Sequence, residues 1–172
     1  MVKKELKKVW DFLWKDDSIY SWIVSILLAF IIVKFVFFPL LSLVLGTTMP
    51  LVVVESSSMH HPGSFLGDTF GTLGSFNIWW NDKGTWYENE GINKTRAEEW
   101  PLRTGLEMGD IVVVARASNL EIGNIIIFNA GQQHPIIHRI VGINRISGEV
   151  IYSTKGDNNE GQLISEKEIK ES

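Results

Sequence analysis

The sequence predicts a mainly β protein, in which an antiparallel β domain is preceded by one N-terminal transmembrane helix. Two observations support this fold class. An apolar run near the N-terminus is long enough to cross a bilayer, and short apolar segments separated by turn residues follow it without helical periodicity. Short strands in series favour antiparallel pairing. We therefore expect a cytoplasmic N-terminal segment (1–19), a transmembrane helix (20–46) and an outer domain (47–172).

The apolar run extends from Trp22 to Leu45, and Lys34 is its only charged residue. Because an α-helix rises by about 1.5 Å per residue, roughly 20 such residues cross the hydrocarbon core of a bilayer. A buried core helix is the alternative, but so small a domain could hardly cover a helix that is apolar on all sides. The run is also too long for the apolar region of a cleaved signal peptide. Pro39 is expected to kink the helix or to mark its far end.

The distribution of lysines predicts the orientation of this helix. Several lysines precede the run, whereas no Lys or Arg occurs from Gly46 to Asn81. The positive-inside rule then places the N-terminus in the cytoplasm and the outer domain outside. Apolar residues ahead of the run recur at helical spacing: Leu6, Val9, Trp10, Leu13 and Trp14. This pattern favours a helix on the cytoplasmic membrane surface, and a helix packed against protein is the alternative.

The composition excludes several classes of function. The chain has no cysteine, which rules out disulfides, thiolate metal sites and a cysteine nucleophile. Its formal net charge of −4 provides no basic face of the kind that nucleic-acid binding requires. We therefore expect no nucleic-acid partner.

The outer domain alternates strand-like segments with turn residues. The expected strands are Leu51–Val54, Ile111–Ala115, Asn124–Phe128, Ile136–Ile143 and Glu149–Ser153. Between the first two lies a Gly- and Trp-rich segment, at about 63–105, with weak periodicity. Its aromatic residues form either a small core or a surface that rests on lipid headgroups: Trp79, Trp80, Trp86, Tyr87 and Trp100.

Three polar groups in the outer domain could together carry out acyl transfer. Ser56-Ser57-Ser58-Met59 follows the first strand, His138 lies within an apolar strand, and Thr154–Asn159 contains Asp157. Each taken alone is more simply a turn or a structural residue. Serine becomes a nucleophile when a neighbouring base removes its proton, and a neutral imidazole can do this near pH 7. An acidic group can then orient the imidazole.

A metal hydrolase is an alternative interpretation of the same histidines. His134 and His138 are four residues apart, but Pro135 and the β-branched neighbours indicate a strand there. The His60-His61 pair lies in a turn and is a poor chelating pair, and no H-E-x-x-H motif occurs. We therefore expect neither a metal nor another cofactor.

These motifs, taken in order, resemble the type I signal peptidase family, in its archaeal and endoplasmic-reticulum branch. A strand leads into Ser-x-Ser-Met, and Gly-Asp with a hydrophobic strand, His-Arg-Ile-Val and Thr-Lys-Gly-Asp-Asn-Asn follow. The bacterial branch carries lysine just before the arginine of the third motif, whereas His138 precedes Arg139 here. The resemblance extends from the apolar run almost to the C-terminus and implies a partly coiled antiparallel sheet.

The resemblance assigns roles to four residues. Ser58 matches the nucleophile, His138 the general base and Asp157 the first acidic residue near the C-terminus. Ser56 matches a position whose hydroxyl helps to form the oxyanion hole, and the backbone N–H of Ser58 would be the second donor.

The family removes signal peptides from exported preproteins at the outer membrane face, cutting after small residues. The resemblance therefore implies a membrane-bound serine endopeptidase with signal peptides and the lipid bilayer as partners. The chain could also associate with the protein translocation machinery. A related membrane serine protease with another substrate, and a catalytically inactive membrane-anchored interaction protein, are the alternatives.

Three features depart from the family pattern. The Trp-rich segment is an insertion where the family has a short turn. A second aspartate is usual six residues after the first, but Leu163 stands there, with Glu160 and Glu166 as weaker substitutes for the acid. The chain ends at Ser172, where the family continues into another strand, so we expect either a fragment or an open sheet edge.

Overall fold

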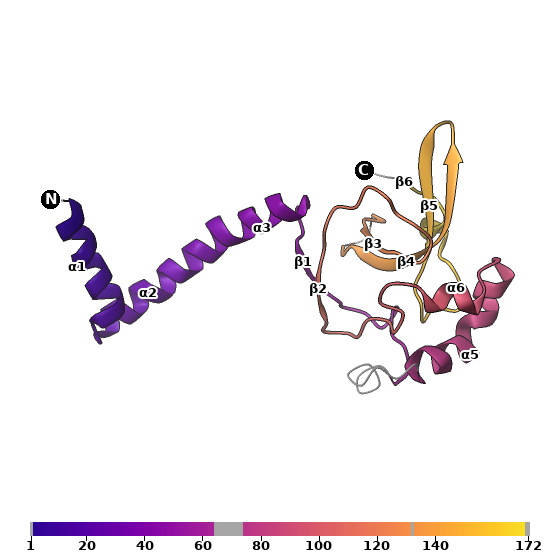
Figure 1. Ribbon diagram of the computed structural model, residues 1–172, viewed down its shortest axis with the longest axis horizontal. Coiled ribbons are helices and arrows are strands. Elements are labelled where there is room, and N and C mark those ends of the chain that lie inside the picture. Colours follow the sequence, from indigo (N-terminus) through magenta and orange to yellow (C-terminus); the bar gives the residue numbers. More distant parts are fainter. Residues whose placement is uncertain (1, 64–73, 132, 171–172) are drawn as a thin grey trace. The chain divides into compact units, whose positions relative to one another are not determined.

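The computed structural model describes residues 2–63, 74–131 and 133–170 (Figure 1). The chain folds as two compact units. The first contains Met1–Leu51 with Val113–Arg116, and the second contains Val52–Val112 with Ala117–Ser172. All candidate site residues belong to the second unit.

A long apolar helix dominates the first unit. It comprises α2 (Ile19–Ile32), the π-helical segment η1 (Val33–Phe37) and α3 (Phe38–Leu45). This helix of 27 residues contains an 18-residue window with a mean hydropathy of 2.7, so it is long and apolar enough to cross a bilayer, as expected. Pro39 has no N–H to donate to the preceding turn, and the wider π-helical winding precedes it. Gly46, with φ +65°, ends the helix in the left-handed conformation.

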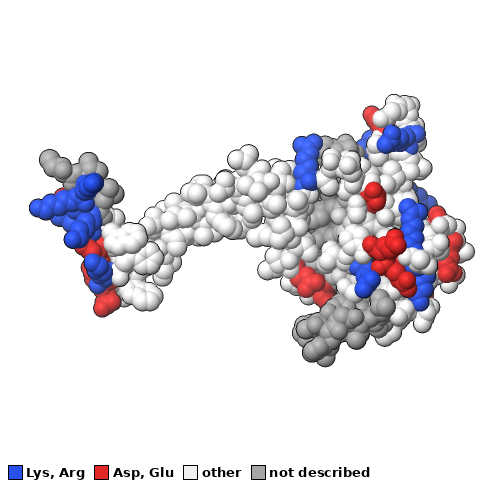
Figure 2. Space-filling model, viewed as in Figure 1, with Lys and Arg blue, Asp and Glu red and all other residues white. Residues whose placement is uncertain are grey.

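The predicted N-terminal helix is α1 (Val2–Lys15). Two serines of α2 join it to the apolar helix. The Ser21 hydroxyl donates to the carbonyl of Phe12 at 2.5 Å, and Ser25 donates to that of Leu13 at 3.4 Å. These bonds satisfy carbonyls that the end of α1 leaves without helical partners. Charged side chains of both signs gather on α1, whereas the apolar helix beyond it, which carries Lys34, is white on the face that Figure 2 shows.

An antiparallel sheet of four strands forms the centre of the second unit. Its order is β3 (Ile125–Phe128), β4 (Ile136–Ile146), β5 (Glu149–Lys155) and β6 (Ile169–Lys170). Ser147 and Gly148 connect β4 to β5 with φ angles of 54° and 89°, as a tight hairpin turn requires. A second sheet pairs β1 (Leu51–Val53) with β2 (Ile111–Val113). Each predicted strand is present, and β6 is an addition.

The insertion folds into helices that the sequence analysis did not predict. They are α5 (Gly74–Asn89) and α6 (Lys94–Glu98), and residues 64–73 of the insertion lie outside the described part of the chain. With these helices and those of the first unit, the protein is 40% helix and 19% strand, so the mainly β class is not confirmed. The antiparallel pairing is confirmed.

The aromatic residues of the insertion form a core. Its buried members are Phe76, Trp79, Trp80, Tyr87, Ile92, Ala97, Trp100 and Val141. Val141 comes from β4, so this core joins the insertion to the sheet. Because the rings of Trp79, Trp80 and Trp100 are buried, they are not free to rest on lipid headgroups.

Of the glycines that contact this core, Gly123 should tolerate an added side chain least. Its φ is +103°, and an added Cβ would lie 2.1 Å from Trp100 Cδ1. Gly148 is a matched control, because its φ of +89° is similar and nothing lies within 4 Å of its Cβ position. We expect Gly148→Ala to cost about 1 kcal/mol of unfolding free energy and Gly123→Ala roughly 2 kcal/mol more. Thermal unfolding of both variants in detergent measures this difference, and equal losses would contradict the packing described here.

Candidate active site

Ser58 lies in a tight turn just beyond β1. The His60 N–H donates to the carbonyl of Ser57 at 3.1 Å, which closes this turn. Met59 fixes its position, because its buried side chain packs with Val54 and Leu106. The Met59 carbonyl also accepts the Leu106 N–H at 2.9 Å. The methionine after the serine is therefore an anchor, while the Ser58 side chain stays partly exposed.

His138 is buried on the central strand β4, next to Ile126 of β3. A loop formed by residues 156–158 brings this histidine close to Ser58. An added Cβ on Gly156 would lie 2.7 Å from His138 Nε2 and 2.9 Å from the Ser58 carbonyl oxygen. His138 Nε2 and the Ser58 carbonyl oxygen therefore both border Gly156 and lie close to each other. The fold brings together the serine and the histidine that the sequence analysis paired, although they are 80 positions apart in the chain.

The hydroxyls of Ser56 and Ser58 lie 3.1 Å from each other. Within the described part of the chain, Ser58 makes this hydroxyl contact and no hydrogen bond to His138. The Ser58 N–H also has no hydrogen-bond partner among the described residues. The Ser56 hydroxyl thus lies beside the Ser58 hydroxyl, and the N–H of Ser58 is not engaged by another described residue.

The carboxylate that contacts His138 belongs to Glu166. Glu166 closes the 3₁₀ turn η3 (Ile164–Glu166) and is fully buried. Its Oε1 forms a short hydrogen bond with His138 Nδ1, and its Oε2 accepts the Leu163 N–H at 2.6 Å. Leu163 therefore interacts with Glu166 through its backbone N–H, while its side chain is largely exposed.

Asp157, the predicted acid, lies in a different network. Its carboxylate accepts hydrogen bonds from Arg139 Nε and Nη2, at distances from 2.6 to 3.1 Å. Consecutive residues of a strand face opposite sides, so Arg139 and His138 project from opposite faces of β4. Asp157 pairs with the arginine, and Glu166 contacts the histidine. Of the acids that the sequence analysis considered, Glu166 is therefore the one that contacts His138.

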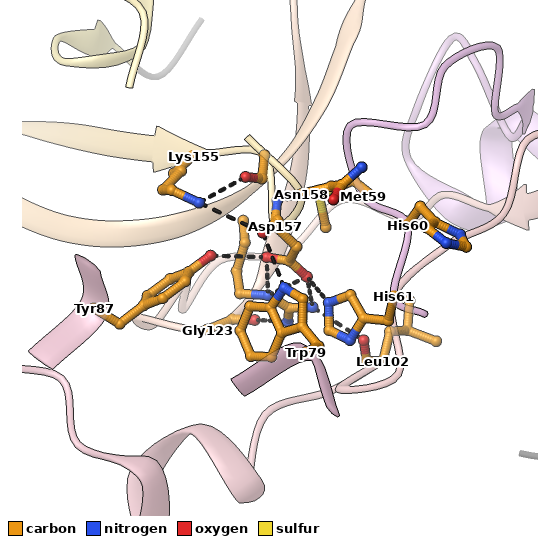
Figure 3. A network of polar contacts seen from close by, with 12 residues as sticks. Met59, His60, His61, Trp79, Tyr87, Leu102, Gly123, Lys155, Asp157 and Asn158 are labelled. Carbon is orange, nitrogen blue, oxygen red and sulfur yellow. Dashed lines mark hydrogen bonds and ion pairs between the residues drawn. The ribbon is translucent and has the colours of Figure 1, made fainter. Parts of the chain in front are cut away.

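His61 and two side chains of the insertion complete the network around Asp157 (Figure 3). The Tyr87 hydroxyl donates to Asp157 Oδ1 at 3.2 Å, and the Trp79 indole N–H donates to the Asp157 carbonyl at 2.9 Å. His61 Nε2 lies 3.0 Å from Asp157 Oδ2, and its ring stacks on Trp79 with centroids 4.2 Å apart. Sequence reasoning missed these partners, because nothing in the pattern links residues 61, 79 and 87 to residue 157.

The electrostatics of the network follow from burial and from Arg139. Burial alone would raise the pKa of Asp157, but the Arg139 guanidinium and the His61 hydrogen bond hold that pKa well below its usual range. Burial lowers the pKa of His61, against the opposing effect of Asp157. Burial, together with the Asp157 charge, raises the pKa of Tyr87. Near pH 7, Asp157 is therefore ionised, while His61 is neutral and Tyr87 keeps its proton.

The other histidines form separate pairs. His60 Nδ1 lies 2.8 Å from the Glu107 carboxylate, and His134 Nδ1 lies 3.2 Å from Glu55. In the ranges that the structure describes, no cluster of three or more His, Asp or Glu side chains could hold a metal ion.

Lys155, directly before the loop of residues 156–158, is a further buried charge. Its ammonium donates to the carbonyl of Gly156 at 3.0 Å and lies 4.8 Å from the centroid of the Tyr87 ring. Burial lowers the pKa of Lys155 from 10.5 to about 8, although Asp157 opposes this shift.

The depressed pKa of Lys155 predicts a pH-dependent stability. Between about pH 8 and 10.5, the folded protein has released this proton while the unfolded chain still binds it. The unfolding free energy should therefore rise with pH in this window, by up to about 3 kcal/mol, relative to a Lys155→Met variant. Denaturant unfolding of both proteins at pH 7, 8.5 and 10.5 measures this difference. A difference that stays constant with pH would contradict the assignment.

Comparison with known proteins adds no family to this geometry. No protein-family model, curated protein or solved structure matches the chain. A functional assignment therefore rests on the site itself.

Proposed function

We propose that this protein is a membrane-anchored serine endopeptidase of signal-peptidase type, with Ser58, His138 and Glu166 as its catalytic residues. One observation carries the proposal. The two ring nitrogens of His138 face different partners: Nδ1 contacts the Glu166 carboxylate, and Nε2 lies at the loop that also contacts Ser58. This is the order of nucleophile, base and orienting acid that acyl transfer requires.

The chemistry follows from the hydrogen-bonding capacity of each group. An ionised carboxylate only accepts hydrogen bonds, so Glu166 holds the proton of a neutral imidazole on Nδ1. Nε2 is then free to take the proton of Ser58 as its oxygen attacks a peptide carbonyl. The resulting imidazolium is stabilised by Glu166 and returns the proton to the leaving amine. Hydrolysis of the acyl-enzyme repeats these steps with water as the nucleophile.

The Ser58 hydroxyl must turn from Ser56 toward His138 for this reaction. Catalytic hydrogen bonds are often long or misaligned without substrate, and a rotation about χ1 of serine requires no backbone movement. Ser56 would then be free to donate its hydroxyl, with the Ser58 N–H, to the oxyanion of the tetrahedral intermediate. Each such donor typically contributes about 10²–10³ in turnover.

The membrane anchor supports signal peptides as the substrate class. The lysines of α1 favour a cytoplasmic N-terminus and a catalytic unit on the outer side of the cell membrane. A short connection joins the end of the apolar helix at Leu45 to Ser58. A nucleophile tethered in this way meets substrates that are themselves anchored by an apolar segment. This topology also brings the protein within reach of the translocation machinery.

Cleavage of a preprotein tests the proposal directly. Detergent-solubilised protein should cut a preprotein after a small residue, whereas Ser58→Ala and His138→Ala should lose at least about 10³-fold in kcat. The products are identified by mass spectrometry. Equal cleavage by all three proteins would overturn the catalytic assignment. No cleavage by the parent would favour an inactive anchor, and cleavage of soluble proteins without signal peptides would favour a protease with another substrate.

A second experiment separates the two buried acids. Glu166→Gln should lower kcat by about 10²-fold or more with little change in melting temperature, because the amide oxygen can still accept the Leu163 N–H. Asp157→Asn should instead lower stability by about 3–5 kcal/mol, because it leaves the buried Arg139 charge without its counterion. Turnover and thermal unfolding are measured on both variants. A stable but inactive Asp157→Asn beside a fully active Glu166→Gln would restore Asp157 as the catalytic acid.

A further inference from the structure

The loop of residues 156–158 contacts both halves of the candidate dyad. The Asn158 N–H donates to the Ser58 carbonyl at 2.8 Å, and the Asn158 side-chain amide donates to the Ser57 carbonyl at 3.0 Å. Gly156 packs so closely against His138 Nε2 and Ser58 that a Cβ would not fit. The distance between the serine and the histidine therefore depends on where this loop is held.

Helix α5 of the insertion holds the middle of the loop from the other side. Trp79 donates its indole N–H to the Asp157 carbonyl, and Tyr87 donates its hydroxyl to the Asp157 carboxylate. Both side chains are almost completely buried, with exposed fractions of 1% and 0%. Hydrogen bonds in such a site are protected from competing water, so they fix the peptide more firmly than exposed ones would.

We infer that helix α5 positions the candidate active site, with Trp79 and Tyr87 as the residues that hold the loop of residues 156–158 against Ser58 and His138. The expected effect on catalysis rests on the proposed function, whereas the expected effect on the position of the loop does not. The insertion thus has a second role beyond forming its own core.

The neighbouring residue Trp80 provides a matched control. Trp80 is also buried in the aromatic core, where its ring stacks on Phe76 and Tyr87. Among the described residues it makes no hydrogen bond to the loop. Trp79→Phe and Trp80→Phe therefore remove similar volumes from one core, but the first alone removes a bond to Asp157. Tyr87→Phe removes a single hydroxyl and serves as the mildest variant.

Two readouts test the inference. The first is hydrogen exchange at the Asn158 amide, which reports whether the loop stays bonded to Ser58. The second is the separation of kcat from KM on a preprotein. We expect Trp79→Phe to speed this exchange and to lower kcat about 10-fold with KM unchanged, and Tyr87→Phe to do the same about 3-fold. Trp80→Phe should lower the melting temperature by as much as Trp79→Phe while leaving exchange at Asn158 and kcat near those of the parent.

The outcomes distinguish this inference from the proposed function. Equal changes in exchange and kcat for the two tryptophan variants would mean that the insertion acts only as a packed core, which would overturn the inference. If Trp79→Phe fails to fold, unchanged exchange in Tyr87→Phe has the same meaning. If the parent cleaves no preprotein, the proposed function fails, and exchange at Asn158 still decides whether α5 holds the loop.

Discussion

The buried ion pair between Arg139 and Asp157 is the interaction on which the second unit depends. Besides Asp157, the Arg139 guanidinium donates to the carbonyls of Pro101, Leu102 and Gly123, at 2.8–3.0 Å. One fully buried side chain thus joins strand β4, the end of the insertion, the approach to β3 and the loop of residues 156–158. A buried charge is tolerated when it is paired and hydrogen-bonded in this way. Removing one partner leaves a buried group unpaired, which lowers the free energy of unfolding strongly.

The pleat of strand β4 places two adjacent residues in two separate polar networks. His138 faces Glu166 and the Ser58 side, and Arg139 faces Asp157 and the insertion. A change on the arginine face reaches the histidine face through the loop of residues 156–158, because Gly156 contacts His138 and Asp157 contacts Arg139. Two carboxylates close in sequence can therefore have different roles, one in holding the fold and one in orienting an imidazole.

The sequence predicts most of the framework, because apolar runs and turn residues are local signals. The apolar helix and the five strands were predictable in this way, whereas the pairing of Ser58 with His138 came from the resemblance and from the chemistry of the two side chains. Helix α5 was not, because its glycines and its aromatic residues on several sides hide the 3.6-residue period. Glu166 was a weak candidate, because only the turn at Ile164–Glu166 carries its carboxylate back to β4. Apart from Arg139, the partners of Asp157 named above (His61, Trp79 and Tyr87) lie 70–96 positions away along the chain, and no local pattern encodes such contacts.

The indole bond from Trp79 to the Asp157 carbonyl makes the second unit dependent on helix α5. The helix supplies this donor and, through Tyr87, a second one to the carboxylate. A shortened chain without α5 would therefore expose the buried ion pair and leave the Asp157 carbonyl to water, so this segment cannot be trimmed without a large loss of stability.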